Sequence, residues 1–432
     1  MKTIQEVVQN IGRSVDRNRW SELAQSFAPQ VEVDYSSMTG EAPKSLTPEE
    51  IVEMWKPFLE NFDEVHHYVT GITVVEEDTL ATVESDVFAT HHIAGFESWK
   101  VYGRYSHFLK KIEGEWKVYK MIFHFSHSEG SQDVVSAAVL RMSVGFKRVI
   151  LEVGGERVVG NLYSPKGCVG KLSAFVIGGS WTTVKEQMMA NYAQELAKAG
   201  YVALTLDPRG FGESAGLKGY ESATRKIEEY TAAFEYLSNL ECVDSQSISL
   251  LGLCASSGYM LKTAQMLQSK VKTVFLAAPW LHNCELVEMI YGGKEGVSEK
   301  IQMAEEAFAL YQKTGVWQTV PACSTTNPYA AMFGEFEYYL NSNRGAVKAW
   351  DNTFAVASWK EWLEFDAFSG VEDISAKIVV VHSKEGAIPM GVDILEKKAK
   401  KCEVVWTTGS QFDFYDNTKN ISEVITIIKE RV

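Results

Sequence analysis

The hydrophobic and polar positions of the chain follow different patterns in its first and second parts. In the first 30 residues, apolar side chains recur every three or four positions, which predicts amphipathic helices. From residue 79 to residue 127 the pattern alternates, in TLATVESDVFATHHI, SWKVYGRYSHFLKKI and EGEWKVYKMIFHFSH. Helices followed by long antiparallel strands predict an α+β cone, a strongly curved sheet whose interior is a pocket.

The pattern of the second part, from about residue 146, predicts strands and helices in alternation. Its strand segments, LSAFVIGGS, YVALTLD, SISLLGLC, KTVFLAAPW and KIVVVHS, are apolar without alternation. Such runs, separated by helical segments, predict a mostly parallel sheet that is buried on both faces, in an α/β fold. The last two strands are separated by a long segment rich in aromatic residues and Met. We expect it to form a helical cap over about residues 282–366.

The boundary between the two parts is predicted from a change in composition. A length of 432 residues favours two or three domains. Residues 128–145, SEGSQDVVSAAVLRMSVG, pass from a polar Ser/Gly stretch into a short helical segment. We therefore expect a first domain at residues 1–130, a linker at 131–145 and a second domain at 146–432.

Charge and cysteine content exclude several classes of function. The chain has 42 Lys and Arg against 56 Asp and Glu, so its net charge of −14 should repel nucleic acid. It has no apolar run of membrane-spanning length and no apolar stretch at its start, which predicts a cytoplasmic protein that does not bind membranes. The six cysteines are far apart, which indicates reduced thiols and not disulfides. We expect no cofactor.

The clearest chemical signal in the second part follows a predicted strand. Gly252-Leu253-Cys254-Ala255-Ser256 lies between the strand SISLL and a helix. A turn of this kind lifts a nucleophile above the sheet, and here the nucleophile is a thiol. Because Cys254 precedes a helix, we expect the helix dipole and the free backbone N–H groups to lower the pKa of the thiol.

Residues 146–432 resemble the α/β hydrolases, and the cysteine is similar to that of the dienelactone-hydrolase-like branch. The resemblance implies an oxyanion hole formed by the N–H of Ala255 and by the turn Gly179-Ser180-Trp181. Two positions depart from the family pattern. Glu385 is the nearest acid after the strand KIVVV, and Gln411 stands where the family has its catalytic histidine.

Gln411 cannot replace a histidine as a base, because its amide does not titrate. His282 follows the strand KTVFLAAPW, at the same edge of the sheet as Cys254, and is the candidate substitute base or substrate contact. The predicted nucleophile, base and acid are then Cys254, His282 and Glu385. Without a working base, the alternatives are a C–C bond reaction at the oxyanion hole or binding without turnover.

Most histidines lie in the first part, which suggests a separate chemistry there. Residues 10–125 resemble the SnoaL-like and scytalone-dehydratase-like group of the nuclear-transport-factor-2 fold, through the stretches SVDRNRW, VDY, VHHYVTG and LKKIEGEWK. The resemblance implies Asp16, Tyr35 and His67 as a catalytic aspartate, a water-holding tyrosine and a catalytic histidine. A second catalytic histidine of the family falls near Tyr102 or Tyr105, with His107 as the nearest true histidine.

This set predicts acid–base chemistry. A histidine held by an aspartate removes a proton α to a carbonyl, while a tyrosine hydroxyl polarises that carbonyl or assists the departure of water. The alternatives are a pocket that only binds a ligand and a scaffold domain. The pairs His66-His67 and His91-His92 favour no metal site, since adjacent residues on a strand point to opposite faces.

Together the two resemblances imply a natural-product tailoring enzyme of polyketide type. The first hypothesis is that Cys254 attacks an ester, lactone, thioester or activated C–C bond of an apolar substrate. The alternative is a dehydratase or cyclase that works in the first domain, beside a hydrolase domain that only binds substrate. Cones of this type often pair through their sheets, so we expect a homodimer.

Overall fold

The computed structural model describes residues 2–167 and 169–432, which divide into two compact units at Met1–Ser143 and Val144–Val432. The segment predicted as a linker contains helix α5 (Asp133–Ser143), which belongs to the first unit. Arg141 of α5 donates to Asp63 Oδ1 at 2.6 Å and to the carbonyl oxygen of Asn61 at 3.1 Å. None of the helices in the described ranges combines the length and the apolar character that crossing a bilayer requires.

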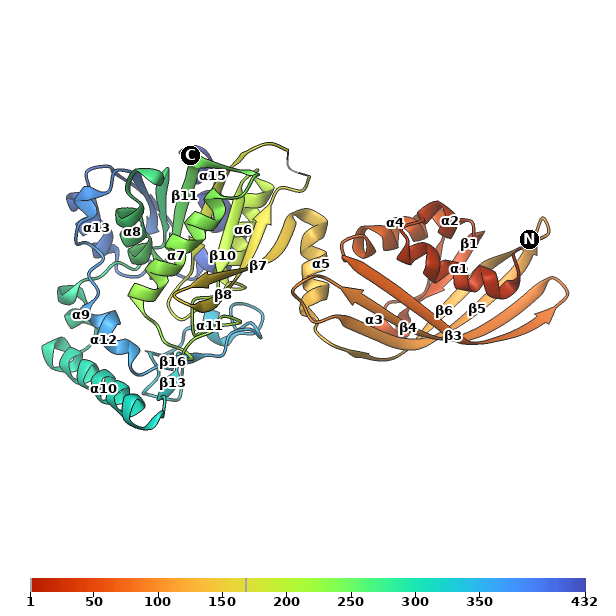
Figure 1. Cartoon of the computed structure of the whole chain (residues 1–432), viewed down its shortest axis with the longest axis horizontal. Helices are drawn as coiled ribbons and strands as arrows, with labels where there is room; N and C mark the ends of the chain where they lie inside the picture. Colours follow the sequence, from red (N-terminus) through yellow and green to blue (C-terminus); the bar gives the residue numbers. More distant parts are fainter. Residues whose placement is uncertain (1, 168) are drawn as a thin grey trace. The chain divides into compact units, whose positions relative to one another are not determined.

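The first unit is a six-stranded sheet covered by helices, in the strand order β2-β1-β6-β5-β4-β3 (Figure 1). Four long strands form an antiparallel meander, and β1 joins β6 in parallel. The strands are β1 (Phe27–Asp34), β2 (Lys44–Leu46), β3 (Glu64–Glu77), β4 (Leu80–His92), β5 (Trp99–Ile112) and β6 (Glu115–Glu129). The remaining helices are α1 (Ile4–Asp16), α2 (Trp20–Ala24), α3 (Ser36–Thr39) and α4 (Pro48–Leu59).

Helix α1 forms where the sequence pattern predicts it. Thr3 and Glu6 make a capping box at its start, each side chain bonding the other residue's backbone N–H. Its apolar positions are buried and pack towards β3, as the helical period requires. Helix α4 begins in the same way, with Thr47 and Glu50 as its capping box. Both helices cover one face of the sheet.

The second unit contains an eight-stranded sheet in the order β18-β17-β12-β11-β9-β10-β8-β7. Six neighbouring strands of this sheet, β18, β17, β12, β11, β9 and β10, run in parallel, and β8 and β7 close one edge antiparallel. The strands are β7 (Gly145–Val153), β8 (Glu156–Ser164), β9 (Leu172–Gly178), β10 (Val202–Leu206), β11 (Val243–Leu253), β12 (Thr273–Ala277), β17 (Lys377–Ser383) and β18 (Cys402–Thr407). Every residue of β10 and β12 is buried, as expected for a sheet covered on both faces.

Helices connect these strands and pack on the sheet (Figure 1). They are α6 (Met188–Lys198), α7 (Ala223–Ser238), α8 (Ser256–Leu267), α13 (Pro389–Lys398), α14 (Asp413–Asp416) and α15 (Thr418–Lys429), with short 3₁₀ turns at Gln268–Lys270 and Val371–Asp373. Both predicted architectures, the α+β cone and the mostly parallel α/β sheet of a hydrolase fold, are confirmed.

The segment between β12 and β17 is built from helices and short strands. Its helices are α9 (Cys284–Ile290), α10 (Gly293–Thr314), α11 (Glu337–Leu340) and α12 (Ser358–Glu364). Its strands form two small ladders, β13 (Thr319–Pro321) with β16 (Thr353–Ala355), and β14 (Cys323–Ser324) with β15 (Met332–Phe333). We call residues 282–366 the cap.

Candidate functional site

A cavity of about 350 Å³ lies inside the first unit, between helices α1 and α4 and the sheet. Its wall is mainly apolar, with contributions from Val8, Ile11, Val33 and Trp55. The polar residues on its wall include four of the predicted site residues, namely Tyr35, His67, Tyr105 and His107. Such a mostly apolar cavity with a few polar groups is typical of a site for a small organic ligand.

Asp16 holds His67 through two hydrogen bonds. Asp16 is the last residue of α1, and its Oδ1 lies 2.7 Å from His67 Nδ1, while its Oδ2 accepts the backbone N–H of His67 at 2.9 Å. A carboxylate accepts hydrogen bonds, so Nδ1 carries a proton, and in the neutral imidazole Nε2 keeps a lone pair. Within residues 2–167 and 169–432, Nε2 has no protein partner, and His67 lines the cavity. This nitrogen is therefore available as a base.

Gly12 allows helix α1 to approach β3 at this point. A Cβ atom placed on Gly12 would lie 2.9 Å from His67 Cβ, which is closer than real Cβ contacts. Sequence reasoning missed Gly12, because a single glycine in a helical pattern gives no indication of what it faces. The absence of its side chain sets the position of the His67 ring.

Tyr35 and Tyr105 form a hydroxyl pair on the same cavity wall. Their Oη atoms are 2.9 Å apart, and their rings meet edge to face. Burial raises the pKa of Tyr35 well above its usual value and the pKa of Tyr105 to about 12. Both hydroxyls stay protonated near neutral pH, so one hydrogen joins the pair and the other can be donated to a ligand.

Two further rings, His91 and Trp99, line the cavity and were not predicted as site residues. Burial, together with the nearby His67, lowers the pKa of His91 to about 4. Burial alone lowers the pKa of His107 to about 4. Both imidazoles are therefore neutral near pH 7. The alternation of β4 was the available signal for His91, because His91 and Ala89 lie on the same face of the sheet as His67, which pairs with Ala89.

Cys254 occupies the strained turn that the motif predicts. It follows β11 directly with φ of 52°, a left-handed conformation that is costly for a non-glycine residue. Gly252 makes the turn compatible with helix α8, since an added Cβ would lie 2.6 Å from Ser257 Cα. Trp280 and Ser257 each donate a backbone N–H to the carbonyl oxygen of Cys254, at 3.0 Å. The backbone geometry is that of a nucleophile elbow.

Hydroxyl groups and one amide surround the thiol. Ser180 Oγ bonds Tyr339 Oη at 2.7 Å and accepts from Tyr415 Oη at 3.4 Å. Tyr415 Oη in turn accepts from Gln411 Nε2 at 3.2 Å. The structure thus brings Ser180 and Gln411, both predicted, to Cys254 and adds two tyrosines that sequence reasoning missed.

The expectation of a lowered thiol pKa is wrong. Burial raises the pKa of Cys254 above its usual value, because the thiolate would lose its hydration. Hydrogen bonds from Ser180, Tyr415, the backbone N–H of Ala255 and Gln411 oppose this effect without overcoming it. The side chain is only 7% exposed, so desolvation outweighs the helix N-terminus.

The predicted base and acid do not complete a triad. His282 Nδ1 accepts the indole N–H of Trp280 at 3.0 Å, and Nε2 lies 2.8 Å from the carbonyl oxygen of Trp362. Both ring nitrogens are occupied, and burial lowers the pKa of His282 to about 4, so this residue is a structural histidine. Glu385 is exposed, and its backbone N–H bonds Ser383 Oγ at 3.1 Å.

The Gln411 amide is held by the backbone around it. Nε2 donates to the carbonyl oxygen of Ala278 at 2.8 Å, and Oε1 accepts the N–H of Ala387 at 2.9 Å. In a conventional triad, a carboxylate would accept a hydrogen bond from the histidine at this position. Here the side chain at this position instead accepts the backbone N–H of Ala387. The base position is thus filled by a fixed, non-titrating group.

The aromatic residues of the cap are packed against each other and against the sheet. Five rings of the cap are 2–8% exposed, and they are Tyr338, Tyr339, Trp350, Trp359 and Trp362. Trp181 of the predicted oxyanion turn stacks on Trp362, with ring centroids 4.5 Å apart. These rings form a core under the cap.

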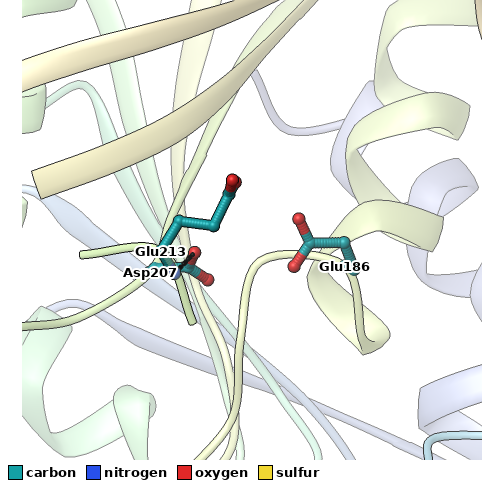
Figure 2. A group of neighbouring side chains, drawn as sticks. All are labelled: Glu186, Asp207 and Glu213. Carbon is teal, nitrogen blue, oxygen red and sulfur yellow. Dashed lines mark hydrogen bonds between the residues drawn. The ribbon is translucent and has the colours of Figure 1, made fainter. Parts of the chain in front are cut away.

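A group of three carboxylates lies beside the loop that carries Ser180. Glu186, Asp207 and Glu213 place oxygens within 4.8 Å of one another (Figure 2). Lys185 Nζ already lies among them, at 2.6 to 2.7 Å from each carboxylate. Burial disfavours the ammonium, yet the three carboxylates raise the pKa of Lys185 above its usual value. An ammonium thus occupies the position that a metal ion would take, and the group anchors the loop after β9.

Comparison with known proteins identifies the first unit. Residues 1–122 match the SnoaL-like domain family. Protein PA2218 of Pseudomonas aeruginosa is 37% identical over 122 residues, which cover 28% of this chain and 33% of PA2218. The crystal structure of PA2218 covers 67% of this chain and 94% of its own, with a TM-score of 0.60 and 22% identity.

Other relatives match parts of the chain. Polyketide transferase claH of Penicillium crustosum is 30% identical to this chain over an aligned segment. That segment covers 25% of this chain and 35% of claH. Thiohydrolase aneE of Aspergillus aculeatus is 28% identical over a segment that covers 32% of this chain and 43% of aneE. The chain thus spans less than half the length of PA2218, claH and aneE in the sequence matches. The α/β hydrolase GrgF from Penicillium covers 66% of this chain and 99% of its own, with a TM-score of 0.55 and 16% identity, which shows a shared fold.

Proposed function

Residues 1–122 are a SnoaL-like domain and the second unit has an α/β hydrolase fold, and from this combination we propose a two-domain tailoring enzyme for polyketide-type compounds. The relatives named polyketide transferase and thiohydrolase support this class of substrate. The principal chemistry we assign to the first unit is proton removal next to a carbonyl, in a dehydratase, isomerase or cyclase.

One observation carries this assignment. His67 is fixed by Asp16 at 2.7 Å and lines a cavity of about 350 Å³, and its Nε2 has no protein partner among the described residues. Nε2 takes the proton from the carbon α to a substrate carbonyl, which leaves an imidazolium stabilised by the Asp16 carboxylate. In a dehydration, the C–O bond to the β-hydroxyl then breaks, and the same proton returns from the imidazolium to the hydroxyl, which leaves as water.

The tyrosine pair supports the departure of that hydroxyl. Tyr35 and Tyr105 share one hydrogen bond of 2.9 Å, and the second hydroxyl hydrogen can be donated to the leaving oxygen. Burial keeps both tyrosines protonated, so they act as donors. No proton has to leave either tyrosine during the reaction.

Deuterium exchange at the α carbon tests the proposal without knowledge of the natural substrate. With 1-tetralone, a bicyclic ketone, in D₂O, we expect the wild-type protein to accelerate exchange of the α hydrogens, as measured by proton NMR. His67→Ala should return the rate to that of buffer, and Cys254→Ala should keep the wild-type rate. Equal rates for the wild type and His67→Ala would refute the assignment.

A second activity, acyl transfer to Cys254, is supported by the elbow geometry and by the relatives named polyketide transferase and thiohydrolase. The thiol sulfur would form a thioester bond to the acyl carbon of a donor thioester, and the donor thiol would leave with the Cys254 proton. Gln411 cannot activate water, so the acyl group would stay on the enzyme. Incubation with S-acetyl-N-acetylcysteamine should then add one acetyl group that is stable for hours by intact-protein mass spectrometry. A Cys254→Ala variant that gains the same mass would disprove this activity.

A further inference from the structure

Two short hydrogen-bond chains end at the sulfur of Cys254. In the first, Tyr339 Oη and Ser180 Oγ are 2.7 Å apart, and the Ser180 hydroxyl bonds the sulfur. In the second, Gln411 Nε2 donates to Tyr415 Oη at 3.2 Å, and the Tyr415 hydroxyl bonds the sulfur. The 3.4 Å between Tyr415 and Ser180 is long for a bond between two hydroxyls, so the hydrogens of both can point to the sulfur instead.

The groups in these chains donate hydrogen bonds and do not act as bases at neutral pH. Burial raises the pKa of Tyr339 and of Tyr415 well above the usual value, so both hydroxyls stay protonated. The Gln411 amide does not titrate. His282, the predicted base, has both ring nitrogens occupied. These groups can therefore stabilise a negatively charged sulfur, but they cannot remove a proton from an incoming nucleophile.

This property restricts the second substrate of an acyl transfer. The thioester of Cys254 is cleaved when a nucleophile attacks its carbonyl carbon, and water or an alcohol must lose a proton to a base during that attack. An amine is largely a charged ammonium at neutral pH, which a buried site disfavours. A thiol has a pKa of about 8.5, so part of it is already thiolate and needs no base.

We infer that the second unit transfers acyl groups from one thiol to another, with a thiol as the acceptor that releases the acyl group from Cys254. This inference rests on the second activity of the proposed function and adds the class of acceptor. The acceptor thiolate forms a C–S bond to the acyl carbon, and the bond from that carbon to Cys254 Sγ breaks. The departing sulfur accepts hydrogen bonds from Ser180 and Tyr415, and it then takes up a proton from solvent, which replaces the proton that the acceptor lost.

The acetyl-enzyme of the full chain tests the acceptor class. The wild type is acetylated with S-acetyl-N-acetylcysteamine, and gel filtration removes the donor and the released thiol. Three acceptors with one frame are then added separately at equal concentration, namely N-acetylcysteamine (a thiol), N-acetylethanolamine (an alcohol) and N-acetylethylenediamine (an amine). We expect intact-protein mass spectra to show loss of the acetyl group with the thiol alone. The loss should be more than about tenfold faster than exchange of the same thiol with S-acetylmercaptoethanol in buffer.

Two matched variants test the hydrogen-bond chains. Tyr415→Phe keeps the ring and removes one donor to the sulfur, so release of the acetyl group by the thiol should slow about tenfold. Tyr329→Phe removes the hydroxyl of an exposed tyrosine of the cap and should keep the wild-type rate.

The outcomes separate this inference from the acylation of Cys254. If the alcohol releases the acetyl group as fast as the thiol, or if the thiol acts no faster than in buffer, the acceptor class is wrong although acylation stands. A wild-type rate in Tyr415→Phe would show that the chains do not assist the departing sulfur. If peptide mapping finds no acetyl group on Cys254, the second activity fails and the inference fails with it.

Discussion

Asp16 and His67, which are 51 residues apart in sequence, are joined by both oxygens of one carboxylate. One oxygen fixes the backbone of β3 and the other fixes the ring, so position and tautomer are set by the same side chain. Asp16→Asn replaces one acceptor with a donor and removes the charge that stabilises the imidazolium. We expect the α-hydrogen exchange rate to fall about 100-fold, with about 1.5–3 kcal/mol lost from the free energy of unfolding. A variant that keeps the wild-type exchange rate would contradict this role of Asp16.

Gly12→Ala tests the close approach of α1 to β3. Alanine in a helix normally stabilises it by about 0.8–1 kcal/mol relative to glycine. Here the added Cβ meets His67 Cβ at 2.9 Å, so we expect a net destabilisation of about 1–3 kcal/mol and slower exchange. Thermal unfolding and the exchange assay measure the two effects. An increase in Tm with unchanged exchange would show that the contact relaxes freely.

The tyrosine pair should behave as one unit in a double-mutant cycle. Tyr35→Phe or Tyr105→Phe leaves the other buried hydroxyl without its partner, at a cost of about 1–3 kcal/mol each. The double variant removes both hydroxyls, so we expect it to lose less stability than the two single losses combined. Denaturant unfolding provides the three values. Strict additivity would mean that the hydroxyls do not interact.

The neutral histidines of the cavity predict a loss of stability in acid. The pKa of His107 is about 4 in the folded chain and about 6.5 when unfolded, so below pH 6.5 the unfolded state binds the proton first. At pH 5 this residue should cost about 2 kcal/mol relative to pH 7. His107→Gln removes the titrating group. The fall in stability of the first unit between pH 7 and pH 5 should be smaller in the variant by that amount, and an identical fall would exclude His107 as its source.

Gln411→His tests what the second unit lacks. A histidine at this position lies beside Cys254 and can activate water, so we expect thioester hydrolysis to rise at least tenfold over the wild type. Release of the thiol from S-acetyl-N-acetylcysteamine, followed with a chromogenic thiol reagent, measures the rate. The double variant Cys254→Ala/Gln411→His is the matched control. Equal turnover with and without Cys254 would show that the new histidine acts alone.

Local patterns predicted the parts of the site that depend on neighbouring residues in sequence. The Gly-Leu-Cys-Ala-Ser turn places Cys254 on an elbow because strand, turn and helix follow each other directly. Asp16 and His67 were predicted from the resemblance to a family. Only that resemblance indicated that two residues 51 positions apart in sequence belong to one site. The fold class of both units was predicted for a similar reason, because the spacing of apolar residues within each segment indicates a helix or a strand.

The errors arose where distant segments decide the chemistry. His282 was predicted as a base from its place after β12, but Trp362, 80 residues later, occupies its Nε2. The helix N-terminus suggested an activated thiol, whereas the desolvation that raises the pKa of Cys254 comes from the fold around it. The roles of Gly12 and Trp99 were not visible because each depends on what lies opposite in space.

Burial of Cys254 has a kinetic consequence for any reagent that reaches it. The thiol is 7% exposed, and Tyr291 and Tyr339, which lie close to it, belong to the cap. A reagent can attack only after these residues move, so the observed rate should rise with reagent concentration and then level off. The height of that plateau is a direct measure of how often the cap opens. The cavity of the first unit is partly open to solvent, so the rate of ligand binding there should scale with concentration throughout.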